Sequence, residues 1–73
     1  MSPLEAAQTA LAIARKEKLP LPTIARYESD AEGAVNWFVR NIRRFFEPES
    51  NGAVEAISNS QLRRYVAWMR TTK

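Results

Sequence analysis

Residues 29–46, SDAEGAVNWFVRNIRRFF, carry the apolar pattern that decides the fold. Successive residues of an α-helix turn by about 100°, so apolar residues spaced three or four apart share one side. That side holds Ala31, Ala34, Val35, Phe38, Ile42 and Phe45, with Phe46 at its edge. The roughly opposite side holds Arg40, Arg43 and Arg44, with Trp37 beside them. The stretch therefore predicts a helix with one face in a core and a basic face outside it.

The ends of this helix are explained by folding alone. Ser29 and Glu32 have the spacing of a capping box, and Asp30 and Glu32 lie at the positive end of the helix dipole. The arginines lie nearer the negative end, which also favours basic side chains. Pro48 is expected to end the helix.

Two further helices flank this one. The first is expected to run from an N-cap at Ser2 to about Lys18, with Glu5 completing a capping box. Its apolar side holds Leu4, Ala7, Ala10, Leu11 and Ala14, small enough on average to let another helix approach closely. The last helix starts near Ser58 with Gln61 as its capping partner. Its apolar stripe holds Leu62, Tyr65, Val66 and Met69.

The sequence predicts the secondary structure of the segments between the helices less clearly. Prolines in residues 19–22 favour an extended chain, and residues 23–28 read either as a short strand or as a helical turn capped by Thr23. The extended form is slightly favoured, with residues 53–57 as its partner strand. Residues 47–52 are expected to form a loop with an Asn-Gly turn. We predict a mainly α fold, a single small three-helix domain over residues 1–73, with a short two-stranded β element as an optional addition (23–28 with 53–57).

Composition narrows the function classes. The 73-residue chain has no cysteine or histidine, so disulfides, thiolate metal sites and the usual zinc ligands are absent. The acids around residue 30 are expected to act as helix caps, so no metal or other cofactor is expected. Its only glycines are Gly33 and Gly52, which leaves no glycine-rich phosphate loop. With no histidine base and no strained nucleophile turn, we expect no catalytic residue and no enzyme activity.

Membrane association is not expected either. No apolar run approaches the ~18 residues of a membrane span. The N-terminus also lacks the basic region and apolar core of a secretory signal. A net charge of +3 with basic residues on separate faces instead favours a small binding module for an anionic partner.

Arg40, Arg43, Arg44 and Trp37 are the candidate nucleic-acid-binding residues. The planar guanidinium group matches phosphate, and an aromatic ring beside it can stack on an unpaired base. Two other interpretations stay open. The arginines could simply be a solvated face, with Trp37 packing on the first helix or the Leu-Pro linker, or they could contact an acidic protein.

Trp68, Arg64, Arg63 and Ile13 are the candidate partner-binding residues. Arg64 and Trp68 lie four residues apart on a helix, which allows a cation–π contact and places Trp68 off the apolar stripe. Tryptophan is enriched among interface hot spots. Ile13 lies off the stripe of the first helix and could serve a second contact. The alternative for Trp68 is that it closes the core from its edge.

A DNA-binding arrangement is also conceivable for residues 58–64, SNSQLRR. Polar residues followed by arginines resemble the start of a recognition helix, whose first residues contact base edges. The preceding segment reads as loop and strand, however, so the short turn between two helices is not evident.

The opening MSPLEAA (1–7), the stretch WFVRNIRRFF (37–46) and the length together support a resemblance over the whole chain. The chain resembles the small antitermination proteins of lytic Xanthomonas phages, which regulate transcription by binding host RNA polymerase. The resemblance has no defined short motif, so no site residue is transferred from it.

The resemblance implies binding to bacterial RNA polymerase near the RNA exit channel, at the β′ N-terminal region and the β flap. It implies inhibition of initiation at host promoters, through a weakened hold of the σ factor on the flap, and antitermination by discouraging the RNA hairpin. Nascent RNA and NusA would be further partners, and a monomer in the cytoplasm of the host bacterium is expected. The alternatives are a small helical DNA-binding repressor or excisionase-like protein that uses residues 60–64, and a phage inhibitor of another host complex.

Overall fold

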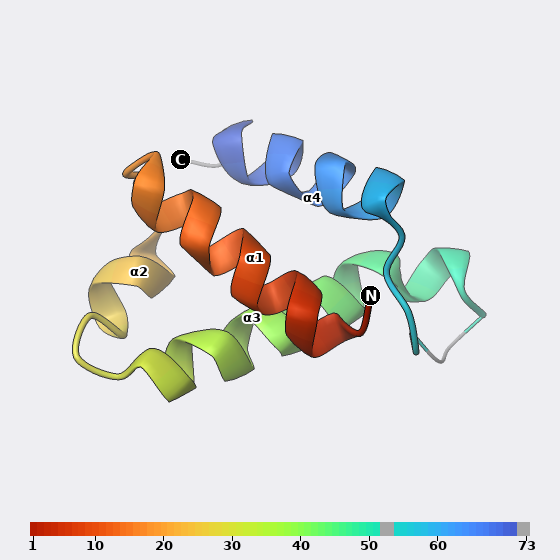
Figure 1. Cartoon of the computed structure of the whole chain (residues 1–73), viewed down its shortest axis with the longest axis horizontal. Coiled ribbons are helices and arrows are strands. Elements are labelled where there is room, and N and C mark those ends of the chain that lie inside the picture. The colour runs from red at the N-terminus through yellow and green to blue at the C-terminus, as the bar shows by residue number, and fades with distance from the viewer. Residues whose placement is uncertain (52–53, 72–73) are drawn as a thin grey trace.

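The computed structural model describes residues 1–51 and 54–71, and within them it is helical without any strand (Figure 1). This confirms the predicted mainly α fold. A fourth, short α-helix appears where the sequence was ambiguous, and a 3-10 turn replaces part of the predicted loop before Asn51. The elements are α1 (Pro3–Lys16), α2 (Pro22–Arg26), α3 (Ala31–Phe46), η1 (Glu47–Glu49) and α4 (Asn59–Thr71).

The two predicted strands are wrong within the described residues. Residues 22–26 form α2, because Pro22 at the first helical position has its φ angle preset for a helix. Residues 54–57 are extended but join no sheet, and Ala53 lies outside the described residues. Instead of pairing with residues 23–28, Ile57 exchanges two backbone hydrogen bonds with Met1, of 2.7 and 2.9 Å.

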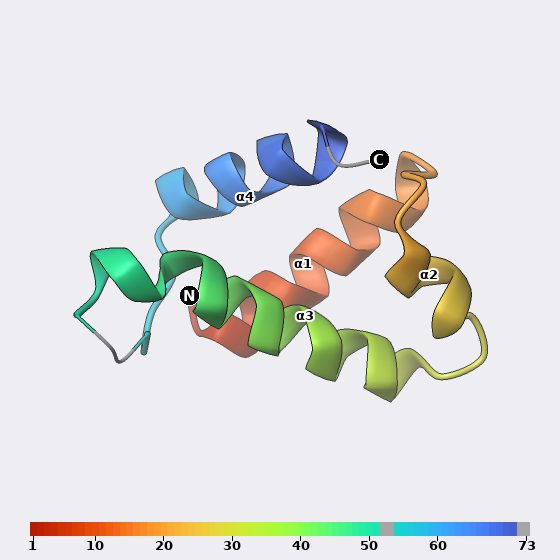
Figure 2. The same cartoon turned by 180° about the vertical axis from the view of Figure 1, so that it is seen from behind.

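Helix α1 lies across α3 and also contacts α4 (Figures 1 and 2). Its small side chains let the α3 backbone approach closely, as the alanine pattern predicts. Leu4 was expected on this face but is 49% exposed, because the buried stripe is shifted by part of a turn. The buried residues of α1 are Ala6, Ala7, Ala10, Leu11 and Ala14.

The buried residues of α3 are spaced four apart, and the row that they form winds slowly around the helix. Its fully or almost fully buried residues are Ala34, Phe38, Ile42 and Phe46. The drift carries the C-terminal end of α3 towards α4, so Phe46 is in the core and Phe45 is only partly buried. Ala31, predicted on the core face, is exposed at the start of the helix.

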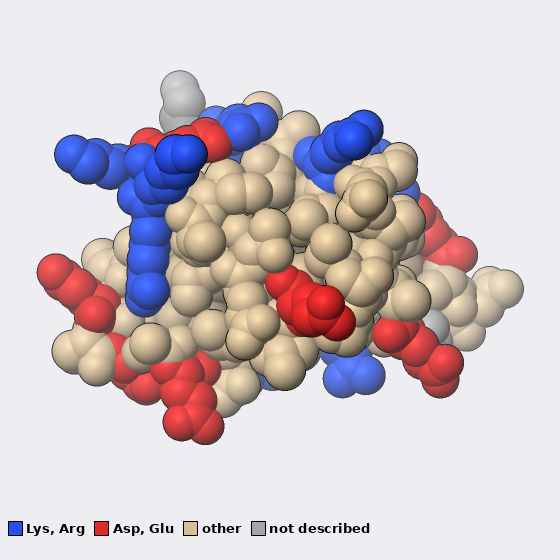
Figure 3. Space-filling view, in the orientation of Figure 1, with Lys and Arg blue, Asp and Glu red and all other residues tan. Residues whose placement is uncertain are grey.

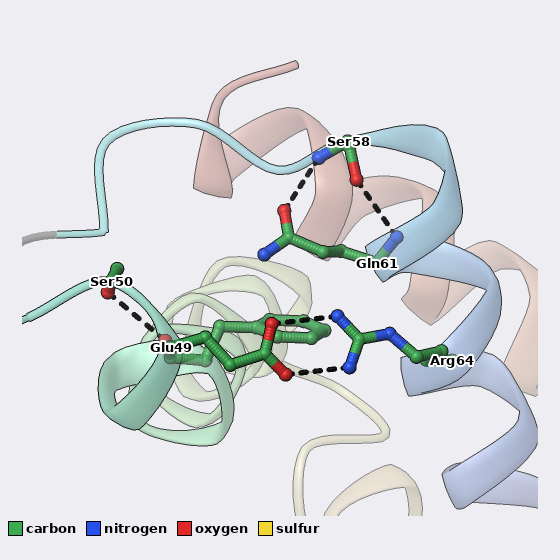
Figure 4. Close-up of polar contacts among 6 residues, drawn as sticks. Glu49, Ser50, Ser58, Gln61 and Arg64 are labelled. Carbon is green, nitrogen blue, oxygen red and sulfur yellow. Dashed lines mark hydrogen bonds and ion pairs between the residues drawn. The ribbon is translucent and has the colours of Figure 1, made fainter.

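Two of the three predicted capping boxes are confirmed. Ser2 and Glu5 cap α1, and Ser58 and Gln61 exchange hydrogen bonds of 2.9 and 3.0 Å at the start of α4 (Figure 4). At α3 the Ser29–Glu32 box is replaced by Asp30, whose carboxylate accepts a 2.9 Å hydrogen bond from the Gly33 N–H.

Gly33 makes room for that cap. A Cβ at this position would lie 2.3 Å from the Asp30 carboxylate oxygen, so a side chain would displace the capping group.

Two ion pairs connect α4 to the rest of the chain. Arg64 binds both carboxylate oxygens of Glu49 at 2.6 and 2.8 Å (Figure 4), and Arg70 binds those of Glu17 at 2.8 and 2.6 Å. In the part of the chain that the structure describes, no helix combines the length and apolar character needed to cross a bilayer.

Candidate nucleic-acid interface

The three arginines of α3 are exposed and keep their charge available. Within residues 1–51 and 54–71, Arg40, Arg43 and Arg44 form no ion pair and no side-chain hydrogen bond. Arg64 and Arg70, by contrast, are each neutralised by a glutamate. An unpaired guanidinium group can form its charge-assisted hydrogen bonds with an external anion.

Trp37 lies close to two of these three arginines. From the 100° rotation per residue, its side chain lies about 20° around the helix from Arg44 and about 60° from Arg40, but about 120° from Arg43. A hollow of about 100 Å³ is accordingly lined by Trp37, Arg40, Asn41 and Arg44, and we call it the arginine hollow. Arg43 does not line it. The structure therefore brings together two of the three predicted arginines with the predicted tryptophan.

A larger apolar groove adjoins the arginine hollow. It has a volume of about 290 Å³ and is lined by residues of α2, α3 and α4 and by Leu21 just before α2. Trp37 and Asn41 line both spaces, so the groove and the hollow lie next to each other. We call it the aromatic groove; its lining is Leu21, Pro22, Thr23, Trp37, Phe38, Asn41, Tyr65 and Trp68.

A buried hydrogen bond fixes the polar part of the aromatic groove. Tyr65 is fully buried, and its hydroxyl donates to the side-chain oxygen of Asn41. Burial raises the pKa of the Tyr65 hydroxyl well above its ordinary value, so it stays protonated and remains a donor. The Asn41 amide is thus held in one orientation, with its NH₂ group left to donate to another acceptor.

Trp68 lies partly in the core and partly at the surface. It is partly buried, and its ring lies 5.4 Å from that of Phe45 and 5.3 Å from that of Tyr65. It therefore closes the core from its edge, while another part of its surface lines the aromatic groove. The groove thus contains Trp37 and Trp68 from two different helices, Trp37 packing edge-on against Phe38 at 5.2 Å.

Arg64 is engaged inside the chain. Its guanidinium group lies 5.4 Å from the centre of the Phe46 ring while it binds Glu49. The hydrogen bond from Arg64 lowers the pKa of the Glu49 carboxyl below its ordinary value. Arg64 is thus already bound to groups of the same chain, whereas the arginines of α3 are not.

Ile13 and Arg63 meet at a separate hollow between α1 and α4. This α1–α4 hollow has a volume of about 230 Å³ and an apolar floor. Figure 3 views the molecule from the α1 side, where uncharged surface separates two groups of basic side chains and an acidic group lies near the middle of the face. The lining residues are Ile13, Leu62, Arg63, Val66 and Arg70.

Sequence reasoning missed the residues that complete the aromatic groove. Asn41 and Tyr65 were not distinguished from other residues of their helices, and Leu21 was read only as linker. Hydrophobic periodicity places Tyr65 in the core but cannot show which neighbour its hydroxyl meets. The two tryptophans were the available signal, although nothing in the sequence places them together.

The proposed recognition helix at residues 58–64 lacks a helix–turn–helix context. Helix α4 begins at Asn59, and the last helical residue before it among residues 1–51 and 54–71 is Glu49. The short turn between two helices that this motif requires is therefore not formed.

Comparisons with protein-family models, curated proteins and solved structures found no match to this chain.

Proposed function

We propose that this protein is a non-enzymatic regulator of bacterial RNA polymerase that presents the arginine hollow to nascent RNA. The observation that carries the proposal is the combination of Arg40 and Arg44, which have no partner among residues 1–51 and 54–71, with Trp37 beside them. Contacts to phosphates position RNA without reading its sequence, which suits a factor that must act on many transcripts.

The resemblance to the phage regulators supplies the polymerase and its location. The protein would act in the host cytoplasm near the RNA exit channel, with the β′ N-terminal region, the β flap and NusA as partners. There it would inhibit initiation at host promoters. By holding emerging RNA as a single strand, it would also oppose the hairpin that terminates transcription.

A second surface is available for the polymerase itself. The α1–α4 hollow combines the apolar Ile13 with the exposed Arg63, and it does not share a residue with the arginine hollow. A protein that binds polymerase through one surface and RNA through the other needs this separation. We therefore assign the polymerase contact to the α1–α4 hollow.

Gel filtration with purified bacterial RNA polymerase tests the proposal first. We expect the protein to co-elute with polymerase, and Arg63→Glu to weaken co-elution while Arg43→Glu, with the same charge change on α3, does not. Failure of the unaltered protein to co-elute would contradict the polymerase proposal. Binding to duplex DNA instead would favour the repressor or excisionase-like alternative.

Terminator read-through tests the arginine hollow separately. Arg40→Ala with Arg44→Ala should reduce read-through several-fold and leave co-elution intact, because phosphate contacts are lost and the α1–α4 hollow is not. Arg15→Ala with Lys16→Ala is the matched control, since it removes the same charge from the exposed end of α1. Equal read-through for both double variants would show that only net charge matters.

A further inference from the structure

We infer that the aromatic groove is a pocket for one unpaired nucleotide base, whose flanking phosphates bind Arg40 and Arg44 in the arginine hollow. This inference rests on the RNA-facing role proposed for α3 and assigns to it a ligand class, single-stranded nucleic acid. It adds Trp68, Asn41 and the start of α2 to the residues that contact RNA.

The lining of the groove suits a planar ring. Trp37 and Trp68 contribute aromatic surface from α3 and α4, and Leu21 and Pro22 contribute apolar surface from the start of α2. Every nucleobase has a π-face that can stack on such side chains. At about 290 Å³, the groove is also large enough for a base rather than only a methyl group or a water molecule.

The position of the charge matches a nucleotide. Trp37 and Asn41 line both the aromatic groove and the arginine hollow, so the apolar and the basic spaces adjoin along one turn of α3. A nucleotide likewise carries a flat ring and a phosphate a few bonds apart. Arg40 and Arg44 form no ion pair in the described part of the chain that would have to be broken first.

The amide of Asn41 favours a base over an apolar protein side chain. Its oxygen is occupied by the Tyr65 hydroxyl, which leaves its NH₂ group as a donor between the two spaces. Base edges carry carbonyl and ring-nitrogen acceptors that this donor can bind. A leucine or phenylalanine side chain would cover the donor without pairing it, which carries a desolvation cost.

Binding in this pocket requires an unpaired base. Bases in a duplex are stacked and paired, and extracting one costs free energy. The pocket would therefore prefer single-stranded over hairpin RNA, which gives the proposed opposition to terminator hairpins a physical basis.

The test compares two strands on the isolated, full-length protein. One is a short oligouridylate, and the other is an abasic phosphodiester strand of the same length, which retains the phosphates but has no ring. Binding is followed by the intrinsic fluorescence of the two tryptophans and by an independent anisotropy titration. We expect the RNA to quench the fluorescence and to bind about tenfold more tightly than the abasic strand, as stacking of one base predicts.

Variants test whether the aromatic groove causes the difference in affinity between the two strands. Asn41→Asp retains the acceptor for Tyr65 but replaces the donor with a negative charge, so it should abolish most of the tenfold preference. Trp68→Leu should do the same, whereas Tyr27→Leu removes a half-buried aromatic ring outside the groove and should not. Circular dichroism reports whether each variant folds, and Asn41→Asp keeps the test valid if Trp68→Leu does not fold.

The outcomes separate this inference from the proposed function. Equal affinity for the two strands, without quenching, would overturn the base pocket and leave the arginine hollow as a phosphate site. An acidic peptide with a central phenylalanine that binds and quenches more strongly than RNA would overturn it in favour of a protein ligand. If neither strand binds at low salt, both the base pocket and the arginine hollow are overturned. Co-elution with polymerase is a separate measurement, so it tests the proposed function whichever of these outcomes is found.

Discussion

Arginines of the same chain have different roles because of what lies opposite each side chain. Arg64 and Arg70 each face a glutamate from another segment, whereas Arg40 and Arg44 line the arginine hollow and pair with no acid in the described part of the chain. From the sequence alone, the arginines of α3 stand out only because they lie close together. The structure shows which arginines have no acidic partner, and this decides whether they can bind an external phosphate.

Tyr65 gives a prediction about alkaline pH. Because burial raises its pKa, the folded state keeps its proton when the unfolded chain loses it near pH 10. Stability from this group is thus complete below about pH 10 and is lost above it, with a slope of at most about 1.4 kcal/mol per pH unit. We expect Tyr65→Phe to show a shallower loss in urea unfolding at alkaline pH than the unaltered protein.

Tyr27→Phe is the control for this measurement. Tyr27 is half-buried and its hydroxyl forms no hydrogen bond among the described residues. All other side chains are the same in the three proteins, so the comparison isolates the tyrosine that is changed. The same alkaline slope in Tyr65→Phe as in Tyr27→Phe would show that burial of Tyr65 does not control it.

Lys18 adopts a backbone conformation that favours glycine. Its φ angle is +53°, and it follows the C-cap of α1, where the Leu19 N–H bonds the Ala14 carbonyl at 3.0 Å. Lys18→Gly should therefore raise the free energy of unfolding by about 0.5–1 kcal/mol, because a left-handed conformation strains a residue with a Cβ. Lys16→Gly, at the last residue of α1, should instead lower it, by at most about 1 kcal/mol. Urea denaturation measures both, and a loss of stability in Lys18→Gly would contradict the role of the strain.

At the scale of elements, α1 and α3 are held by close contact of small with large side chains. The buried alanines of α1 leave space that Phe38, Ile42 and Phe46 of α3 occupy. Their burial is complete, so the interface has no room for a larger residue on the α1 side. This packing holds α3 with its arginines pointing away from the core.

Overpacking tests that interface. Ala10→Leu should lower the free energy of unfolding by about 1–3 kcal/mol, because the added atoms force α1 and α3 apart. Ala12→Leu adds the same atoms on the exposed side of the same helix and should change stability by less than about 0.5 kcal/mol. Denaturation curves for the two variants that coincide would place Ala10 outside a tightly packed interface.

At the scale of the whole molecule, the aromatic groove exists only because three helices meet. Helix α4 provides Tyr65 and Trp68, and its orientation is supported by the ion pairs of Glu49 and Glu17. Hydrogen bonds from Arg64 and Arg70 lower the pKa of both glutamates. The stability from these pairs is thus present above the ordinary glutamate pKa of 4.5 and is lost as the pH falls below it.

Acid unfolding measures this attachment of α4. Glu17→Gln with Glu49→Gln should be less stable than the unaltered protein at neutral pH and should lose less stability as the pH falls below 4.5. Glu28→Gln with Glu55→Gln is the control, since these exposed glutamates form no ion pair within the described residues. High salt should reduce the difference between the double variants, because exposed ion pairs are screened. Identical acid profiles would assign the attachment to apolar packing alone.

Local chemistry by itself determined most of the helices of this protein. Capping residues, prolines and apolar spacing act within a few residues of each other, so they predicted α1, α3 and α4 and the exposed arginines of α3. They could not decide residues 22–26, where the helical preset of Pro22 competes with a sequence that also suits a strand. They also misplaced Ala31 and Phe46, because burial depends on which neighbour each side chain meets.

Only the tertiary structure decided which distant residues form a site. Trp37 and Asn41 lie one turn apart on α3, but no local interaction links them to Tyr65 of α4. Packing of α4 against α3 brings them together, places Trp68 beside them, and leaves Arg40 and Arg44 at the adjoining surface. A binding surface is a property of the distances between elements, and those distances are set by the buried side chains of the whole core.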